Sequence, residues 1–309
     1  MQEKKEEYFF EDIPVIGKLP RKKLAAKLEN MGDIEAAQAI RAKPKRGGFR
    51  WGSKEIPAWK HTAHAFGYIP LIEPGENDHV EITHAGHFKV DETKPSLKNQ
   101  RIKISLGYLR VAEYPGKGIH HVLFDFYAKN QLPKQVEHLH FNQVFRAQQG
   151  ESIGVVNYPI FIGLSVGSEG MDFKCCTVNV KNDDDQKILD FLDSDVVKSG
   201  LKLAKTAQPA IAPLTELAVG ITKMFARRNE NVRVQDFVMG LDFTNVAFGA
   251  YLAEGSYVAV QIPQKNKAIW KWDQWVYNPS NGLIVNKNDN DQLIPYNYLV
   301  FNVSKYDET

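Results

Sequence analysis

The sequence predicts a mainly β protein, built as an antiparallel β-sandwich with an inserted helical hairpin and a small N-terminal helical and irregular region. Three observations predict it. From residue 101 onward, β-branched and aromatic runs alternate with short turn clusters. Residues 182–230 replace that pattern with apolar residues at helical spacings. Residues 1–54 are rich in charge and carry helix signals followed by glycines.

The strand signals come at short, even intervals. Turn clusters such as YPGKG and NPSNG separate them, and their rhythm resembles that of C2-like or immunoglobulin-like sandwiches. Because the signals before and after the helical piece are alike, we expect residues 101–309 to be a single β-domain. The predicted strands lie within residues 101–111, 120–128, 137–145, 151–166, 171–180, 231–243, 245–252, 256–262, 268–277, 282–286 and 293–303.

The helical insertion at 182–230 has two candidate roles. Leu192 and Val196, then Leu214, Leu217 and Ile221, fall at helical spacings, which predicts two amphipathic helices packed on the sheet. The alternative is a lipid-inserting or pore-forming hairpin, since residues 201–226 are the most apolar part of the chain and have basic flanks. A charge at position 217 distinguishes the two roles, because it destabilises a packed helix but abolishes lipid binding by a membrane hairpin.

The N-terminal region divides into two parts. Residues 1–54 are predicted to form a helical hairpin over 19–41, with Asp33 capping the second helix, followed by a basic arm over 41–54. Residues 55–100 are predicted to be irregular, with short strands packed on the main body. Because the core signals begin later in the chain and the basic arm has few apolar residues to bury, we expect a chain without residues 1–54 to fold.

Charge and cysteine content narrow the class of protein. The formal net charge of +2 excludes a chain dominated by polyanion binding but allows a local basic patch. Cys175 and Cys176 are neighbours and cannot cross-link a long loop, which fits a reducing compartment. The first residues carry charges of both signs without an apolar core, so we expect no secretory signal and a cytoplasmic location.

The basic arm is the first candidate binding element. Cations contact phosphates and aromatic rings stack on exposed bases, so this composition suits single-stranded nucleic acid, an acidic protein or an anionic membrane surface, whereas the alternative is a solvated linker. Its candidate binding residues are Arg41, Lys43, Lys45, Arg46, Phe49, Arg50 and Trp51.

Tryptophans form the second candidate. Trp270 and Trp272 would share one face of a predicted strand and could present a platform to a sugar or to a partner protein. The alternative for both rings is core packing.

Histidines form the third candidate. His138 and His140 would lie on one face of a strand, and His84 and His87 are close in sequence, so these four side chains are candidate ligands of a divalent metal. The HxH pair invites comparison with cupin metal sites, but a cupin has a glutamate shortly after the second histidine, where this chain has Phe-Asn-Gln-Val. The alternative is the solvent face of an amphipathic strand.

Motifs for nucleotide chemistry are absent, since the sequence has no GxGxxG or GxxxxGK[ST]. The first hypothesis for function is therefore a non-catalytic protein-binding or assembly module that needs no cofactor. Two alternatives stay open: a metal-dependent enzyme using the histidine groups, and a membrane-acting effector using residues 201–226.

Overall fold

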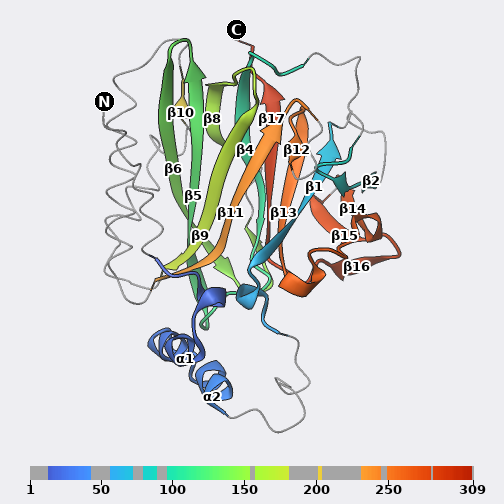
Figure 1. The fold of residues 1–309 in the computed structure, drawn as a ribbon. Helices are drawn as coiled ribbons and strands as arrows, with labels where there is room; N and C mark the ends of the chain where they lie inside the picture. The colour runs from blue at the N-terminus through green and yellow to red at the C-terminus, as the bar shows by residue number, and fades with distance from the viewer. Residues whose placement is uncertain are drawn as a thin grey trace.

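The computed structural model of the chain is mainly β, with antiparallel sheets (Figure 1). It describes residues 13–42, 56–71, 79–88, 96–153, 157–180, 201–203, 231–244, 249–279 and 281–307. Within these residues the strands form three sheets. Two short strand pairs are parallel: β10 (Leu201–Lys202) with β8 (Tyr158–Ser165), and β11 (Val232–Asp242) with β12 (Ala250–Tyr251). The other strand pairs are antiparallel.

The five-stranded sheet holds the longest strands. Its central strand, β9, pairs with β5 and β11, and β5 pairs along its whole length with β6. In spatial order the strands are β12 (Ala250–Tyr251), β11 (Val232–Asp242), β9 (Met171–Val180), β5 (Ile119–Leu132) and β6 (Gln135–Gln148).

The eight-stranded sheet joins distant parts of the chain. β1, from the segment predicted to be irregular with short strands, pairs over all of its eight residues with β13 and is therefore an integral strand of this sheet. In spatial order the strands are β10 (Leu201–Lys202), β8 (Tyr158–Ser165), β4 (Arg101–Arg110), β17 (Tyr298–Lys305), β13 (Gly255–Ile262), β1 (Ala63–Pro70) and β3 (Thr83–His84), with β7 (Ser152–Ile153) beside β4.

These two sheets share one hydrophobic core. Alternate residues of β5 point towards the eight-stranded sheet, where Phe126 lies 5.9 Å from Phe161 of β8 and 5.2 Å from Phe301 of β17, measured between ring centroids. Phe173 of β9 joins the same group, 5.4 Å from Phe301. The aromatic residues recognised as strand formers in the sequence thus supply the contact between the sheets.

A third, smaller sheet covers part of the opposite face of the eight-stranded sheet, at the right of Figure 1. β1 alternates between the two cores: Ala63, Ala65 and Ile69 pack with the small sheet, whereas Tyr68 packs in the main core. Trp272 and Trp275 close the second core. The small sheet consists of β16 (Asp289–Leu293), β15 (Leu283–Asn286), β14 (Trp275–Asn278) and β2 (Val80–Glu81).

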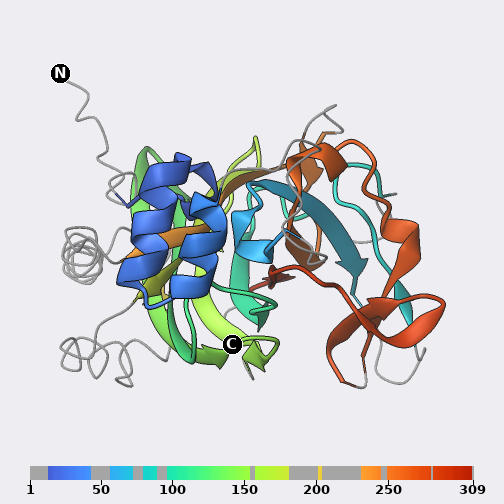
Figure 2. The same cartoon turned by 90° about the horizontal axis from the view of Figure 1, so that it is seen from below.

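The predicted N-terminal helical hairpin is present and docks under the sheets (Figure 2). Helix α1 (Arg21–Asn30) leads into α2 (Ile34–Arg41), whose first turn is capped by Asp33 accepting the N–H of Ala36 at 3.1 Å. The Arg21 guanidinium donates to the carbonyls of Ile40 and Ala42, where helix α2 ends.

The premise that residues 1–54 bury little apolar surface is wrong for residues 13–42. Ile16, Leu24 and Leu28 are fully buried in the main core, and Met31 is 2% exposed. Arg233 of β11 also donates to the carbonyl of Ile13 at 2.7 Å. The N-terminal region is therefore part of the folded body. The sequence did not reveal this, because helical spacing marks an apolar stripe on a helix but not the surface that covers the stripe.

Most of the predicted helical insertion lies outside the described residues. Of residues 182–230 the structure describes 201–203, where Leu201 and Lys202 form the short strand β10 beside β8. Residues 204–226, most of the predicted membrane hairpin, lie outside the described residues. So do the five residues predicted to pack the helices on the sheet: Leu192, Val196, Leu214, Leu217 and Ile221. Within the part of the chain that the structure covers, no helix is long and apolar enough to cross a membrane.

Candidate functional site

Basic side chains from three separate segments gather at the end of the sheets beside α1 and α2. Three single-turn helices form this end: η2 (Ile16–Lys18), η3 (Ala58–Lys60) and η5 (Gln264–Asn266). They lie together at the lower end of the sheets in Figure 1. Lys18, Lys265 and Lys267 are exposed, and Lys60 is half-buried. We call these four lysines the basic end.

The lysines of the basic end have no acidic partner within the described ranges. None of the four forms an ion pair there, whereas Lys117, Lys129, Lys287 and Lys305 elsewhere each pair with a carboxylate. The nearby carboxylate of Glu113 accepts the backbone N–H of Ala58 at 2.8 Å. Among the described residues, no carboxylate neutralises the positive charge of the basic end.

A buried amide network holds the basic end in place. The side chain of Gln261 donates to the carbonyls of His61 and Val234, both at 2.7 Å, and accepts from the amide of Asn297 at 2.9 Å. Asn297 also bonds both backbone groups of Glu113, each at 3.0 Å. Gln261 and Asn297 have no exposed surface, so this network joins η3, β11, β13 and the start of β17 rigidly.

Two histidines beneath the basic end experience its charge. Burial, followed by the charges of Lys267 and Lys18, lowers the pKa of His64 to about 3. Burial, followed by the charge of Lys265, lowers the pKa of His61 to about 4. Lysines from different segments thus act on neighbouring rings, and both histidines are neutral at pH 7.

Acid should therefore destabilise the protein through His64. Its folded pKa of about 3 lies below the ordinary value of 6.5, so between these pH values the unfolded chain binds a proton that the native protein excludes. Stability is retained above pH 6.5 and is lost as the pH falls towards 3. One such group should cost about 2 kcal/mol between pH 7.5 and pH 5.

His64→Phe tests this pH dependence because the ring contacts with Phe66 and Phe237 are retained and the titration is removed. Urea unfolding at pH 7.5 and pH 5 should show a smaller loss of stability in this variant than in the natural protein. Equal losses in the two proteins would show that His64 does not cause the acid sensitivity.

The predicted basic arm lies mostly outside the described residues. Of its candidate residues only Arg41 is described, and its guanidinium pairs with the carboxylate of Glu29. The segment 43–55 connects Ala42, just after α2, to Ile56, just before η3. Lys43, Lys45, Arg46, Phe49, Arg50 and Trp51 lie within that segment, outside the described residues.

The prediction that Trp270 and Trp272 share a strand face is wrong. Trp272 begins the single-turn helix η6 (Trp272–Gln274), and Trp270 precedes it in an irregular segment. Trp272 is 5% exposed, and the Trp270 ring lies parallel to that of Trp275 at 6.2 Å. Both rings pack in or against the second core. Burial of these apolar rings beside the small sheet outweighs the preference of tryptophan for strands.

The candidate metal ligands lie in two places. His138 and His140 are on β6, an edge strand of the five-stranded sheet, whereas His84 ends β3, at one edge of the eight-stranded sheet. The rings of His84 and His87 are 4.7 Å apart. The described residues contain no group of three or more His, Cys, Asp or Glu side chains that could hold a metal ion.

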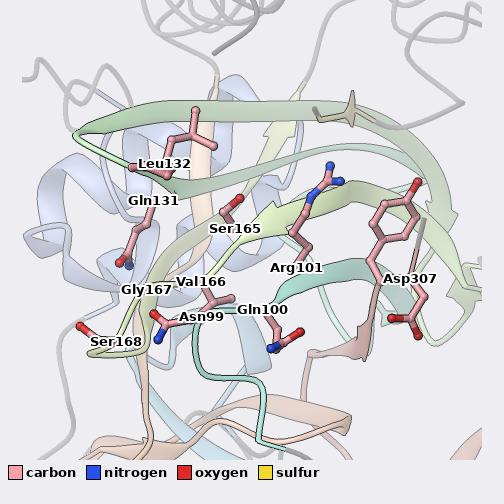
Figure 3. Close-up of a pocket in the computed structure, with 12 residues that line it drawn as sticks. Asn99, Gln100, Arg101, Gln131, Leu132, Ser165, Val166, Gly167, Ser168 and Asp307 are labelled. Carbon is pink, nitrogen blue, oxygen red and sulfur yellow. The ribbon is translucent and has the colours of Figure 1, made fainter. Parts of the chain in front are cut away.

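A pocket of about 700 Å³ opens at the other end of the sheets (Figure 3). Its charged groups have internal partners: the guanidinium of Arg101 donates to the carbonyl of Gly163 at 3.0 Å and lies 5.1 Å from the ring centre of Tyr306. Gln131 donates to the carbonyl of Gly170 at 2.8 Å. The described lining has no histidine, cysteine or lysine, but it includes Asp307 and Ser165, the central serine of a GxSxG run at 163–167.

Sequence reasoning missed Lys18, Lys60, Lys265 and Lys267 because no local signal joins them. They lie in three parts of the chain, and only the pairing of β1 with β13 brings η3 near η5. Comparison with known proteins adds no functional information: no family model matches the chain, and no curated protein or solved structure matches it either.

Proposed function

We propose that the protein is a non-catalytic binding module that takes an acidic protein segment at its basic end. The scaffold in this proposal is an antiparallel β-sandwich made by the five-stranded and eight-stranded sheets. The observation that carries the proposal is the gathering of Lys18, Lys60, Lys265 and Lys267 from three segments, with no carboxylate paired to them among the described residues.

Like charges held together without counter-charges are unfavourable for folding. Burial and the neighbouring charge of Arg21 lower the pKa of Lys60, and three lysines contribute to the lowered pKa values of His61 and His64. An acidic partner would relieve this repulsion, and complementary charge would also speed its association.

A protein partner is favoured over nucleic acid by two exposed apolar side chains at this end. Ile56 is 47% exposed just before η3, and Ile269 is 69% exposed just after η5. Protein interfaces combine apolar contact with a charged rim, whereas a phosphate backbone offers no apolar surface to these side chains. The basic arm is tethered between Ala42 and Ile56 and would extend the same positive surface.

Charge reversal at the basic end tests the proposal. The probe is a fluorescein-labelled peptide of glutamates interspersed with leucines, titrated with the full chain and followed by fluorescence anisotropy at low salt. Lys265→Glu with Lys267→Glu should weaken binding by at least about tenfold, since reversing two exposed charges replaces attraction with repulsion. Thermal stability should change little, because exposed charges contribute little to folding.

The control reverses two exposed lysines elsewhere, Lys98→Glu with Lys202→Glu, and produces the same change in net charge. This variant should bind the peptide nearly as well as the natural protein. Equal weakening in the two variants would reduce the effect to net charge and contradict the proposal. Tighter binding of a single-stranded oligonucleotide than of the peptide would assign the basic end to nucleic acid instead.

A further inference from the structure

The HxH pair of β6 lies on one face of the five-stranded sheet with two polar residues of the neighbouring strand. His138 and His140 alternate with Leu139 and Phe141, which point into the main core. On β5, Tyr127 is the direct cross-strand partner of His140, and Asp125 lies two residues further along the same face. Four side chains capable of hydrogen bonding to an imidazole or a metal therefore share one face.

Each of the two imidazoles is held through its Nδ1 atom. The Nδ1 of His140 lies 3.5 Å from an Asp125 carboxylate oxygen, and the Nδ1 of His138 is hydrogen-bonded to the Tyr127 hydroxyl. Asp125 is 2% exposed, and the amide of Asn142 donates to the same carboxylate oxygen. A buried, anchored carboxylate fixes the orientation of a histidine ring more firmly than solvent does.

Metal-binding histidines characteristically engage one ring nitrogen with a carboxylate, hydroxyl or carbonyl and give the other to the metal. We propose that the Nε2 atoms of His138 and His140 bind one divalent transition-metal ion, such as Cu²⁺, Ni²⁺ or Zn²⁺. Asp125 and Tyr127 are positioning residues that accept the two Nδ1–H groups. Imidazole ligands suit these metals, and Cu²⁺ should bind most tightly.

The protein supplies two ligands to this site from the described residues, and water supplies the others. Glu137, the nearest acid on β6, lies on the opposite face of the strand, and its carboxylate accepts the amide of Asn130 at 2.8 Å. Lys129 is the cross-strand partner of His138, and its ammonium lies 3.9 Å from the carboxylate of Asp172. The negative charge of Asp172 offsets part of the repulsion between Lys129 and a bound metal cation.

The other histidine pair provides a matched control. The rings of His84 and His87 are close, but the Nδ1 of His84 accepts the backbone N–H of Gly86 at 3.0 Å. No described carboxylate orients either ring as Asp125 orients His140. Both histidines are exposed, so replacing them should not disturb the fold.

Cu²⁺ binding to the full chain tests the proposal. Calorimetric titration in a weakly coordinating buffer should give one tight site per chain, and electron paramagnetic resonance should show coupling to two nitrogens. His138→Gln with His140→Gln should abolish the tight site, whereas His84→Gln with His87→Gln should retain it. Asp125→Asn should weaken Cu²⁺ binding by about 10-fold or more and shift the resonance parameters, as loss of an orienting partner does.

Tyr127→Phe gives a second test of positioning that leaves the buried carboxylate in place, in case Asp125→Asn does not fold. Its expected result is weaker Cu²⁺ binding with altered resonance parameters. Retention of the tight site in the His138 and His140 double variant would overturn the proposal, as would its loss in the His84 and His87 variant. Unchanged affinity in folded Asp125→Asn or Tyr127→Phe would overturn the positioning roles. None of these results depends on acidic-peptide binding at the basic end.

Discussion

Gln261→Leu is expected to lower the free energy of unfolding by about 3 kcal/mol, because it leaves buried polar groups without partners. The natural side chain donates to the carbonyls of His61 and Val234 and accepts from Asn297, and all of it lies inside the protein. Leucine fills a similar volume but satisfies none of these groups. Urea unfolding at pH 7.5 measures the change.

The control for this prediction is Gln274→Leu, at an exposed glutamine in the single-turn helix η6. It should shift the unfolding midpoint little, since solvent still satisfies the polar groups around it. If Gln261→Leu were as stable as this control, the amide network would not be what fixes η3 and the lysines around it.

Removal of residues 1–54 is expected to abolish cooperative folding. Ile16, Leu24, Leu28 and Met31 would leave their sites in the main core, and each such burial contributes about 1.5–3 kcal/mol. Their sum, roughly 6–12 kcal/mol, is comparable with the whole stability of a typical domain. Calorimetry of the truncated chain should therefore show no cooperative transition near that of the full protein.

A single substitution, Leu28→Ala, separates packing from the other effects of truncation. It should lower the free energy of unfolding by about 2–5 kcal/mol, whereas Ala26→Gly on the exposed side of the same helix should cost about 1 kcal/mol. A truncated chain with a normal thermal transition would restore the expectation drawn from the sequence, in which this region is dispensable.

Strands were predictable where the chain itself carries the pattern. The runs over 101–111, 120–128 and 171–180 became β4, β5 and β9, because alternating β-branched and aromatic residues suit sheet faces that are buried. The helical hairpin was equally local, since the Asp33 cap and the apolar spacing both lie within it. Local rules fail at residues 268–274, where Trp270 and Trp272 pack in or against a core instead of extending a strand.

The candidate sites were less predictable because they depend on pairing between distant strands. The HxH motif was visible in the sequence, but its hydrogen-bonding partners, Asp125 and Tyr127, became evident only once β5 was paired with β6 in register. The basic end required the pairing of β1 with β13, which joins residues about two hundred positions apart in sequence. Periodicity describes one strand at a time and cannot supply that register.

Lysine footprinting tests the proposed acidic-partner site most directly. The full chain would be methylated reductively with and without a saturating amount of the glutamate and leucine peptide, and the modified lysines identified by mass spectrometry. We expect the peptide to protect Lys18, Lys265 and Lys267, with Lys98 and Lys202 modified equally in both samples. Uniform modification of all five lysines, or protection confined to Lys98 and Lys202, would contradict this expectation.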